Sequence, residues 1–130
     1  MDVVEPPCDH IDLDREGGFP LHRARRWITG SFPDVSPERL STLLLVADAL
    51  LANAFEHAAG PRRVRLLRSP DRALVRVAVD DASPHLLPVL GRPGAADPRH
   101  RGLLLVNRLS SLWGVTPRVD HKTVWAEVVV

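Results

Sequence analysis

Hydrophobic residues recur at helical spacing over three stretches of this 130-residue chain. The longest stretch begins at Ser36 and Pro37, where a capping hydroxyl precedes a proline suited to the first turn, and it runs to Ala59. Its apolar positions cover more than half of the helix circumference, which indicates a largely buried helix. A shorter helix is predicted over residues 19–32, where apolar residues at helical spacing form one face and arginines occupy the solvent-facing positions.

The third helical stretch runs from Gly102 to Leu112, and Trp113 and Gly114 after it are typical of a helix end with a glycine cap. It follows residues 82–100, which contain four prolines, two glycines and three alanines without a sustained period. Loops of this length inside a compact domain are usually functional. We therefore predict a lid loop over residues 82–100.

The strands are predicted from segments in which apolar and polar residues alternate with a period of two. RVRLLR at residues 63–68 and ALVRVAV at residues 73–79 flank SPD, a turn signal, and are expected to form an antiparallel hairpin. Residues 115–119 and 123–130 are predicted to be two further strands, and His10–Asp14 a short one.

The predicted elements follow the order helix, long helix, two strands, loop, helix and two strands. This order indicates an α/β two-layer sandwich, with a mainly antiparallel sheet and about three helices on one face. A chain of 130 residues with 45% hydrophobic composition suits one domain with a substantial core. We expect that domain to span residues 9–130, after a loose tail at residues 1–8.

Composition narrows the classes of function. Seventeen basic and sixteen acidic residues leave a formal charge of +1, which lacks the electrostatic footprint of a dedicated nucleic-acid binder. Cys8 is the single cysteine, and no apolar run approaches the roughly 20 residues that span a bilayer. The N-terminal residues lack the features of a signal peptide. We therefore expect a cytoplasmic protein without direct contact to nucleic acid or membrane, and the six histidines show no metal-ligand spacing.

Five short segments carry the candidate chemistry, and they occur in a fixed order along the chain. They are NAFEHA from Asn53, VAVDDASP from Val77, HRGLLLV from His100, WG at Trp113 and HKTVWAE from His121. In these segments the chain resembles the GHKL or Bergerat-fold ATPases, also called histidine kinase-like ATPases. Within that group it is similar to the small bacterial anti-sigma-factor and serine-kinase regulators, and the resemblance covers residues 19–130.

The resemblance implies a site for ATP and magnesium. It implies that Asn53 supplies a carbonyl oxygen to a magnesium ion held by the phosphates, a role that suits the few protein ligands magnesium takes. It also implies that Asp81 accepts a hydrogen bond from the adenine amine, with Asp80 as the competing candidate. Thr123 is a candidate to complete the adenine pocket through its hydroxyl. The implied ATP-binding set is Asn53, His57, Asp81, Arg101, Gly102, Leu103, Lys122 and Thr123.

Four positions depart from the family pattern. Ala49 stands one helical turn before Asn53, where the family has the glutamate that activates the attacking water or serine hydroxyl. A general base contributes about 10²- to 10⁴-fold to such a reaction, so no catalytic residue is assigned and kinase activity is not expected. Arg99 and His100 stand where the family has glycines that let the backbone approach the phosphates. His121 replaces a glycine at a turn that often needs an unusual backbone angle.

The resemblance therefore predicts an ATP-binding regulator that controls transcription by binding a protein partner. The implied partner is a sigma factor, an anti-sigma antagonist or another transcription regulator, and a homodimer is possible for this class. Two alternatives remain open at this point. One is a degenerate scaffold that has lost nucleotide binding and acts through protein contacts alone, and the other is an active serine kinase of an anti-sigma antagonist.

Overall fold

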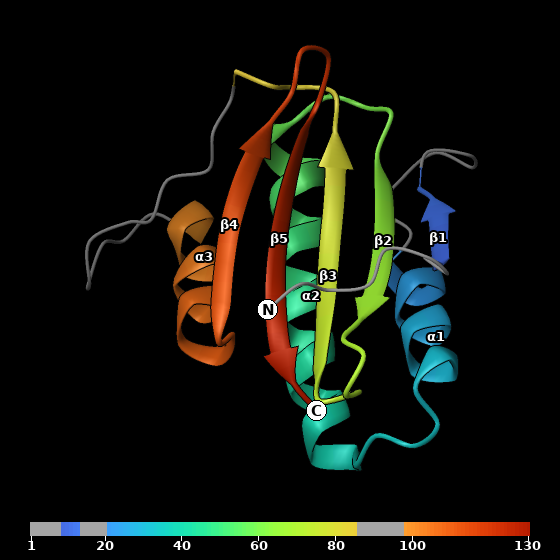
Figure 1. The fold of residues 1–130 in the computed structure, drawn as a ribbon. Helices are drawn as coiled ribbons and strands as arrows, with labels where there is room; N and C mark the ends of the chain where they lie inside the picture. The colour runs from blue at the N-terminus through green and yellow to red at the C-terminus, as the bar shows by residue number, and fades with distance from the viewer. Residues whose placement is uncertain (1–8, 14–20, 86–97) are drawn as a thin grey trace.

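The sheet consists of five antiparallel strands in the spatial order β1-β2-β3-β5-β4 (Figure 1). The structure is a computed structural model that describes residues 9–13, 21–85 and 98–130. The strands are β1 (Asp9–Asp12), β2 (Arg63–Arg68), β3 (Leu74–Asp81), β4 (Leu112–Pro117) and β5 (Lys122–Val129). The chain therefore forms β2 and β3 as a hairpin and then inserts its last strand between β3 and β4.

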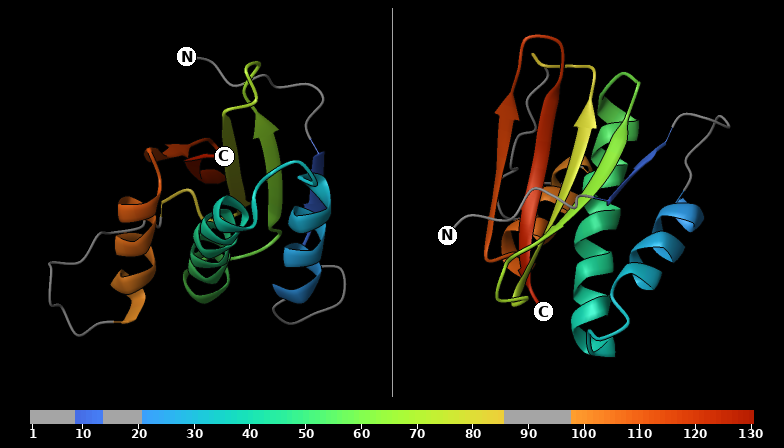
Figure 2. Two further views of the ribbon diagram at one scale, coloured as in Figure 1. Left: turned by 90° about the horizontal axis from the view of Figure 1, so that it is seen from below. Right: turned by 45° about the vertical axis from the view of Figure 1, so that its right-hand side comes forward.

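Three helices lie on one face of this sheet and leave the other face bare of described helices (Figure 2). They are α1 (Leu21–Ser31), α2 (Pro37–His57) and α3 (Pro98–Leu109). The fold is thus the predicted two-layer α+β sandwich with an antiparallel sheet. We call the side of the sheet that meets the helices the inner face, and the opposite side the outer face.

The long helix α2 occupies the centre of the helical layer, behind β3 and β5 (Figure 1). Ser36 caps its N-terminus by accepting a hydrogen bond from the Arg39 N–H at 3.3 Å, and Pro37 takes the first helical position. Its inward side chains are fully or almost fully buried against the valines of β2, β3 and β5, as the apolar pattern predicts. They are Leu43, Val46, Ala47, Leu50, Leu51 and Ala54.

Most predicted elements are present, with shifted ends. The strand predicted at residues 63–68 is β2, and α2 ends two residues before the predicted Ala59. The strand predicted at residues 73–79 continues to Asp81 in β3, which places both aspartates inside the sheet. The predicted tail at residues 1–8 and residues 86–97 of the predicted lid lie outside the described residues.

The third helix is present as predicted, but its predicted bounds and the predicted glycine cap were wrong. Helix α3 already begins at Pro98 and ends at Leu109, and Leu112, Trp113 and Gly114 belong to β4. Gly114 pairs with Trp125 of β5, and a β-carbon built at Gly114 would lie 2.8 Å from the Trp125 ring. The glycine is therefore needed for packing across the sheet, where a missing side chain makes room for a large neighbour, and not for a helix end.

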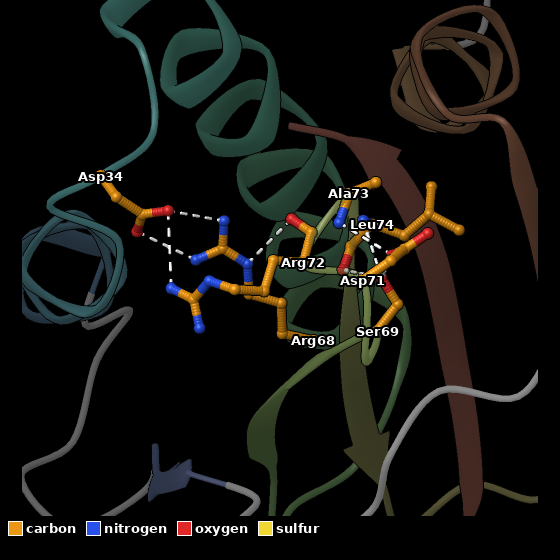
Figure 3. Close-up of polar contacts among 7 residues, drawn as sticks. All are labelled: Asp34, Arg68, Ser69, Asp71, Arg72, Ala73 and Leu74. Atoms are coloured by element: carbon orange, nitrogen blue, oxygen red, sulfur yellow. Dashed lines mark hydrogen bonds and ion pairs between the residues drawn. The ribbon is translucent and has the colours of Figure 1, made fainter.

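An exposed cluster of charges joins the α1–α2 connection to the β2–β3 turn (Figure 3). Arg68 donates two hydrogen bonds, of 2.9 and 2.8 Å, to the carboxylate of Asp34, and Arg72 lies 3.5 Å from it. The hydrogen bonds from Arg68 lower the pKa of Asp34 to about 2. In the turn itself Asp71 accepts hydrogen bonds from Ser69 and from the backbone N–H of Ala73.

Among the described residues, no helix combines the length and the apolar character that crossing a membrane requires.

Candidate functional site

The antiparallel pairing of β3 with β5 sets two pairs of polar residues side by side at one end of the sheet. Asp81 pairs with Lys122, and Asp80 pairs with Thr123. Because side chains alternate between the faces of a sheet, the first pair lies on the inner face and the second pair on the outer face. The four residues thus form two separate clusters, although they are neighbours in sequence.

The inner pair is a buried ion pair. The Lys122 ammonium donates a hydrogen bond of 2.9 Å to Asp81 Oδ1 and another of 3.0 Å to the carbonyl oxygen of Ser83. The Ser83 N–H also donates to Asp81 Oδ1, at 2.9 Å. Lys122 and Asp81 are 1% and 0% exposed, and Asp81 Oδ2 is buried without a hydrogen-bond partner among the described residues. Among the described residues, therefore, no group uses this second acceptor oxygen of the carboxylate.

The end of α2 is attached to the end of β3 next to this ion pair. The Ala59 N–H donates to Ser83 Oγ at 2.8 Å, and the Ala82 N–H donates to the Ala59 carbonyl at 2.9 Å. Arg62 donates to the carbonyl oxygens of Ala54 and Ala58, which satisfies acceptors that the helix end leaves open. The last turns of α2, which contain Asn53 and His57, are thereby held beside the strand that ends in Asp81.

The predicted magnesium ligand, Asn53, is partly buried in α2 and forms no side-chain hydrogen bond with the described residues. His57 is the last residue of α2, and Arg101 and Gly102 lie within α3. Leu103 of α3 is buried, at 2% exposure. Its apolar side chain therefore supports the packing of α3.

Position 49 offers no group for acid–base chemistry. Ala49 is buried in the core, and Asp48 beside it forms an ion pair with Arg25 of α1. Asp48 therefore lies on the α1 side of α2, as its helical offset from Asn53 predicts. Burial raises the pKa of Asp48 above its usual value despite the Arg25 guanidinium. Among the described residues of α2, no carboxylate precedes Asn53 by one turn.

The outer pair consists of Asp80, which was the competing candidate to Asp81, and Thr123, which was the candidate to complete the adenine pocket. Thr123 donates a hydrogen bond of 2.5 Å to Asp80 Oδ1, and Arg65 donates two hydrogen bonds, of 2.9 and 3.0 Å, to the same carboxylate. Asp80 and Thr123 therefore belong to a cluster on the outer face with Arg65. The structure does not bring Thr123 to Asp81, and it places Lys122 there instead.

A cleft of about 360 Å³ opens at this end of the sheet, between the ends of β1, β2 and β3 and the turn before β5. Of the predicted ATP-binding residues whose side chains the structure describes, Asp81 alone lines this cleft. His121 forms its rim and lies 2.7 Å from Asp120, and this hydrogen bond lowers the pKa of Asp120. Arg72 is the sole non-glycine residue at positive φ within the described part of the chain, so His121 has an ordinary backbone conformation.

Sequence reasoning missed that Lys122 is the partner of Asp81, although the signal was present. Asp81 continues the alternation of Val77 and Val79, and Lys122 continues that of Val124 and Ala126. Both residues are therefore predicted by period two to face the same side as the core valines. Lys122 thus gives Asp81 a partner within the protein, which a carboxylate reserved for a ligand would not have.

Neither a scan of protein-family models nor a search of curated protein sequences finds a match for this chain. The candidate site is therefore defined by its geometry, in which a buried carboxylate and a buried ammonium pair at the ends of β3 and β5.

Proposed function

We propose that this protein is an ATP-binding regulator of the anti-sigma-factor type, which controls transcription by binding a protein partner and not by phosphoryl transfer. The site that binds ATP is the junction of α2, β3 and β5. Asp81 accepts a hydrogen bond from the exocyclic amine of adenine, and Asn53 provides an oxygen ligand for magnesium.

The observation that carries this proposal is the unused oxygen of Asp81. A buried acceptor without a donor costs free energy, about 1–3 kcal/mol for a typical group and more for a charged one. With respect to the described residues Asp81 Oδ2 is such an acceptor, and Asp81 lines the cleft of about 360 Å³ together with Asp80 but without Asn53. Clefts of that size lie within the range found for small-molecule sites. A ligand with an N–H group satisfies the oxygen that the protein leaves open.

We infer that ATP binds without phosphoryl transfer because position 49 is occupied by alanine. A phosphoryl transfer to water or to a serine hydroxyl is accelerated by a base that positions the nucleophile. The turn of α2 before Asn53 presents a buried methyl group there, and Asp48 is held by Arg25. ATP in this site is therefore a ligand that stabilises one conformation of the protein, and the partner responds to that conformation.

The proposal is tested by calorimetric titration of the unchanged protein with two nucleotides in the presence of magnesium. ATP carries the exocyclic amine, and purine riboside triphosphate lacks it. We expect saturable binding of ATP and a loss of at least about tenfold in affinity for the analogue, because Asp81 Oδ2 then stays without a donor. Equal affinities for the two nucleotides would remove Asp81 from the adenine site.

Matched variants distinguish the two carboxylates of the cleft. Asp81→Asn is expected to lose ATP affinity, whereas Asp80→Asn changes the neighbouring carboxylate, which also lines the cleft but is already paired with Arg65, and is expected to keep it. Asn53→Ala is expected to lose magnesium-dependent binding and to retain the circular dichroism of the parent. In Ala49→Glu, phosphorylation of a serine-containing partner that the parent does not phosphorylate would identify Ala49 as the reason for inactivity.

A second function is favoured by one specific observation, the ammonium of Lys122. It already donates to Asp81 Oδ1, so the protein itself satisfies half of the carboxylate. In this alternative the ion pair replaces the nucleotide, and the fold acts as a scaffold that binds its partner through surface contacts alone. Absence of ATP binding by the parent at millimolar concentrations, with an intact fold, would establish this alternative.

A further inference from the structure

The outer face of the sheet is covered by its own long side chains. No described helix lies on it, yet Ala78 and Leu67 are 2% and 3% exposed. Their positions in the register place them under Arg65, Arg76 and Trp125. Long arginine side chains can cover apolar surface while they keep their charged ends accessible. The outer face is therefore a layer of arginines and one tryptophan above small and aliphatic residues.

The centre of this layer is a stack with a defined geometry. The Trp125 ring lies against Gly114 of β4, where a β-carbon would come within 2.8 Å of the ring. The Arg76 guanidinium lies 4.1 Å from the Trp125 ring centroid and donates a hydrogen bond of 2.9 Å to Glu127. Such a cation–π contact orients both side chains. The stack is therefore organised before any partner binds.

A small depression beside the stack is lined mainly by arginine and hydroxyl groups. Its volume is about 110 Å³, which is enough for one oxyanion group and too small for a nucleotide. We call it the arginine pocket, and its polar lining consists of Arg65, Arg76, Thr116, Arg118, Thr123 and Trp125.

The charges around the arginine pocket leave one cation in excess. Arg65 is paired with Asp80, and Arg76 is paired with Glu127. Arg118 forms no side-chain hydrogen bond or ion pair within the described part of the chain. In addition, the Nε–H of Arg76 is buried without an acceptor among the described residues. A carboxylate carries the single negative charge that balances this excess, whereas a phosphoryl group at neutral pH carries about −1.5 to −2.

We propose that the outer face of the sheet binds an acidic segment of a protein partner, with one carboxylate of that segment in the arginine pocket. The carboxylate accepts hydrogen bonds from Arg118 and from the free Nε–H of Arg76. Leu112 and Val129, which are 56% and 42% exposed on the same face, contact apolar residues of the segment. Tryptophan and arginine are enriched among the residues that dominate protein interfaces.

The arginine pocket and Asp81 lie on opposite faces of the sheet, so the acidic segment and ATP occupy separate sites. The test uses ¹⁵N-labelled full-length protein and a blocked peptide of alternating glutamate and leucine, with a glutamine and leucine peptide as the control. We expect saturable shifts of the Trp125 indole and Arg76 Nε–H signals with the glutamate peptide, and none with the glutamine peptide.

The variant Arg118→Gln removes the excess cation and leaves the ion pairs of Arg65 and Arg76 in place. We expect it to lower the affinity for the glutamate peptide at least about tenfold. Arg26→Gln, an exposed change on α1, carries the same charge difference and is expected to leave the affinity unchanged. Equal loss in both variants, or no saturable shift at these two residues, would overturn the proposal.

Inorganic phosphate is titrated as a separate arm. Tighter binding of phosphate than of the glutamate peptide at the same two signals would overturn the assignment to a carboxylate. None of these signals depends on ATP, so failure of this proposal and failure of the ATP site give different results.

Discussion

Asp80 and Asp81 are adjacent in sequence and of the same chemical type, but they lie on opposite faces of the sheet and differ in burial and in hydrogen-bond partners. Asp80 on the outer face is partly exposed and receives hydrogen bonds from Arg65 and Thr123. Asp81 on the inner face is fully buried, with one cation, one backbone donor and an oxygen that nothing described satisfies. Burial increases the free-energy consequence of every missing partner, so stability depends more on the inner carboxylate, which is also the one that we propose binds the ligand.

The largest effect is expected from Lys122→Met. It leaves the carboxylate of Asp81 buried without its cation, and removing one partner of a buried ion pair costs about 3–5 kcal/mol. Urea denaturation of parent and variant measures the loss in the free energy of unfolding. The double variant Asp81→Leu with Lys122→Met is the control and is expected to stay close to the parent, because no buried charge then remains unpaired. A single variant as stable as the parent would show that Asp81 is not a buried charge.

The next effect concerns packing on the outer face. Gly114→Ala brings a β-carbon to 2.8 Å from the Trp125 ring and is expected to cost about 1–3 kcal/mol, because the stack must shift. Gly30→Ala is the matched control, since no atom lies within 4 Å of a β-carbon there. That change in α1 is expected to stabilise by about 0.5–1 kcal/mol. Thermal unfolding followed by tryptophan fluorescence compares them, and equal midpoints for the two variants would refute the packing argument.

Asp80→Asn tests the comparison directly. The change weakens the ion pair between Asp80 and Arg65. Because the Arg65 side chain is 28% exposed and the Asp80 side chain 18% exposed, we expect the free energy of unfolding to fall by about 1 kcal/mol. The same urea experiment measures it. A cost as large as that of Lys122→Met would mean that burial does not separate the two faces. The cluster of Arg65, Asp80 and Thr123 would then contribute as much to stability as the buried ion pair does.

The smallest effect belongs to the exposed pair of Asp34 and Arg68 (Figure 3). The pKa of Asp34 is lowered to about 2 in the folded protein, so its contribution to stability is complete above about pH 4 and is lost as the pH falls through 2. Asp34→Asn is therefore expected to be slightly less stable than the parent near neutral pH. The difference should disappear towards pH 2 in denaturation curves recorded over that range, and a difference that grows on acidification would contradict the sign of this linkage.

Local patterns were sufficient for much of the fold. Ser36 and Pro37 mark the start of α2, and the alternation in residues 63–68 corresponds to β2. The choice between helix and strand at Leu112–Gly114 failed, because the apolar spacing of α3 continues in sequence through Leu112. What makes this segment a strand is its pairing with β5, where Trp125 needs the space above Gly114. That pairing is a long-range contact, which periodicity does not contain.

For the candidate site, the sequence by itself determined which side chains were available and, through period two, which face each would take. It showed that position 49 carries no ionisable group, but the strand that it predicted stopped at Val79, two residues before Asp81. Only the tertiary structure decided which groups meet, because the register of β3 against β5 sets Lys122 beside Asp81 and Thr123 beside Asp80. A shift of one residue in that register would separate Asp81 from Lys122, and it would turn the side chains of one strand to the opposite face of the sheet.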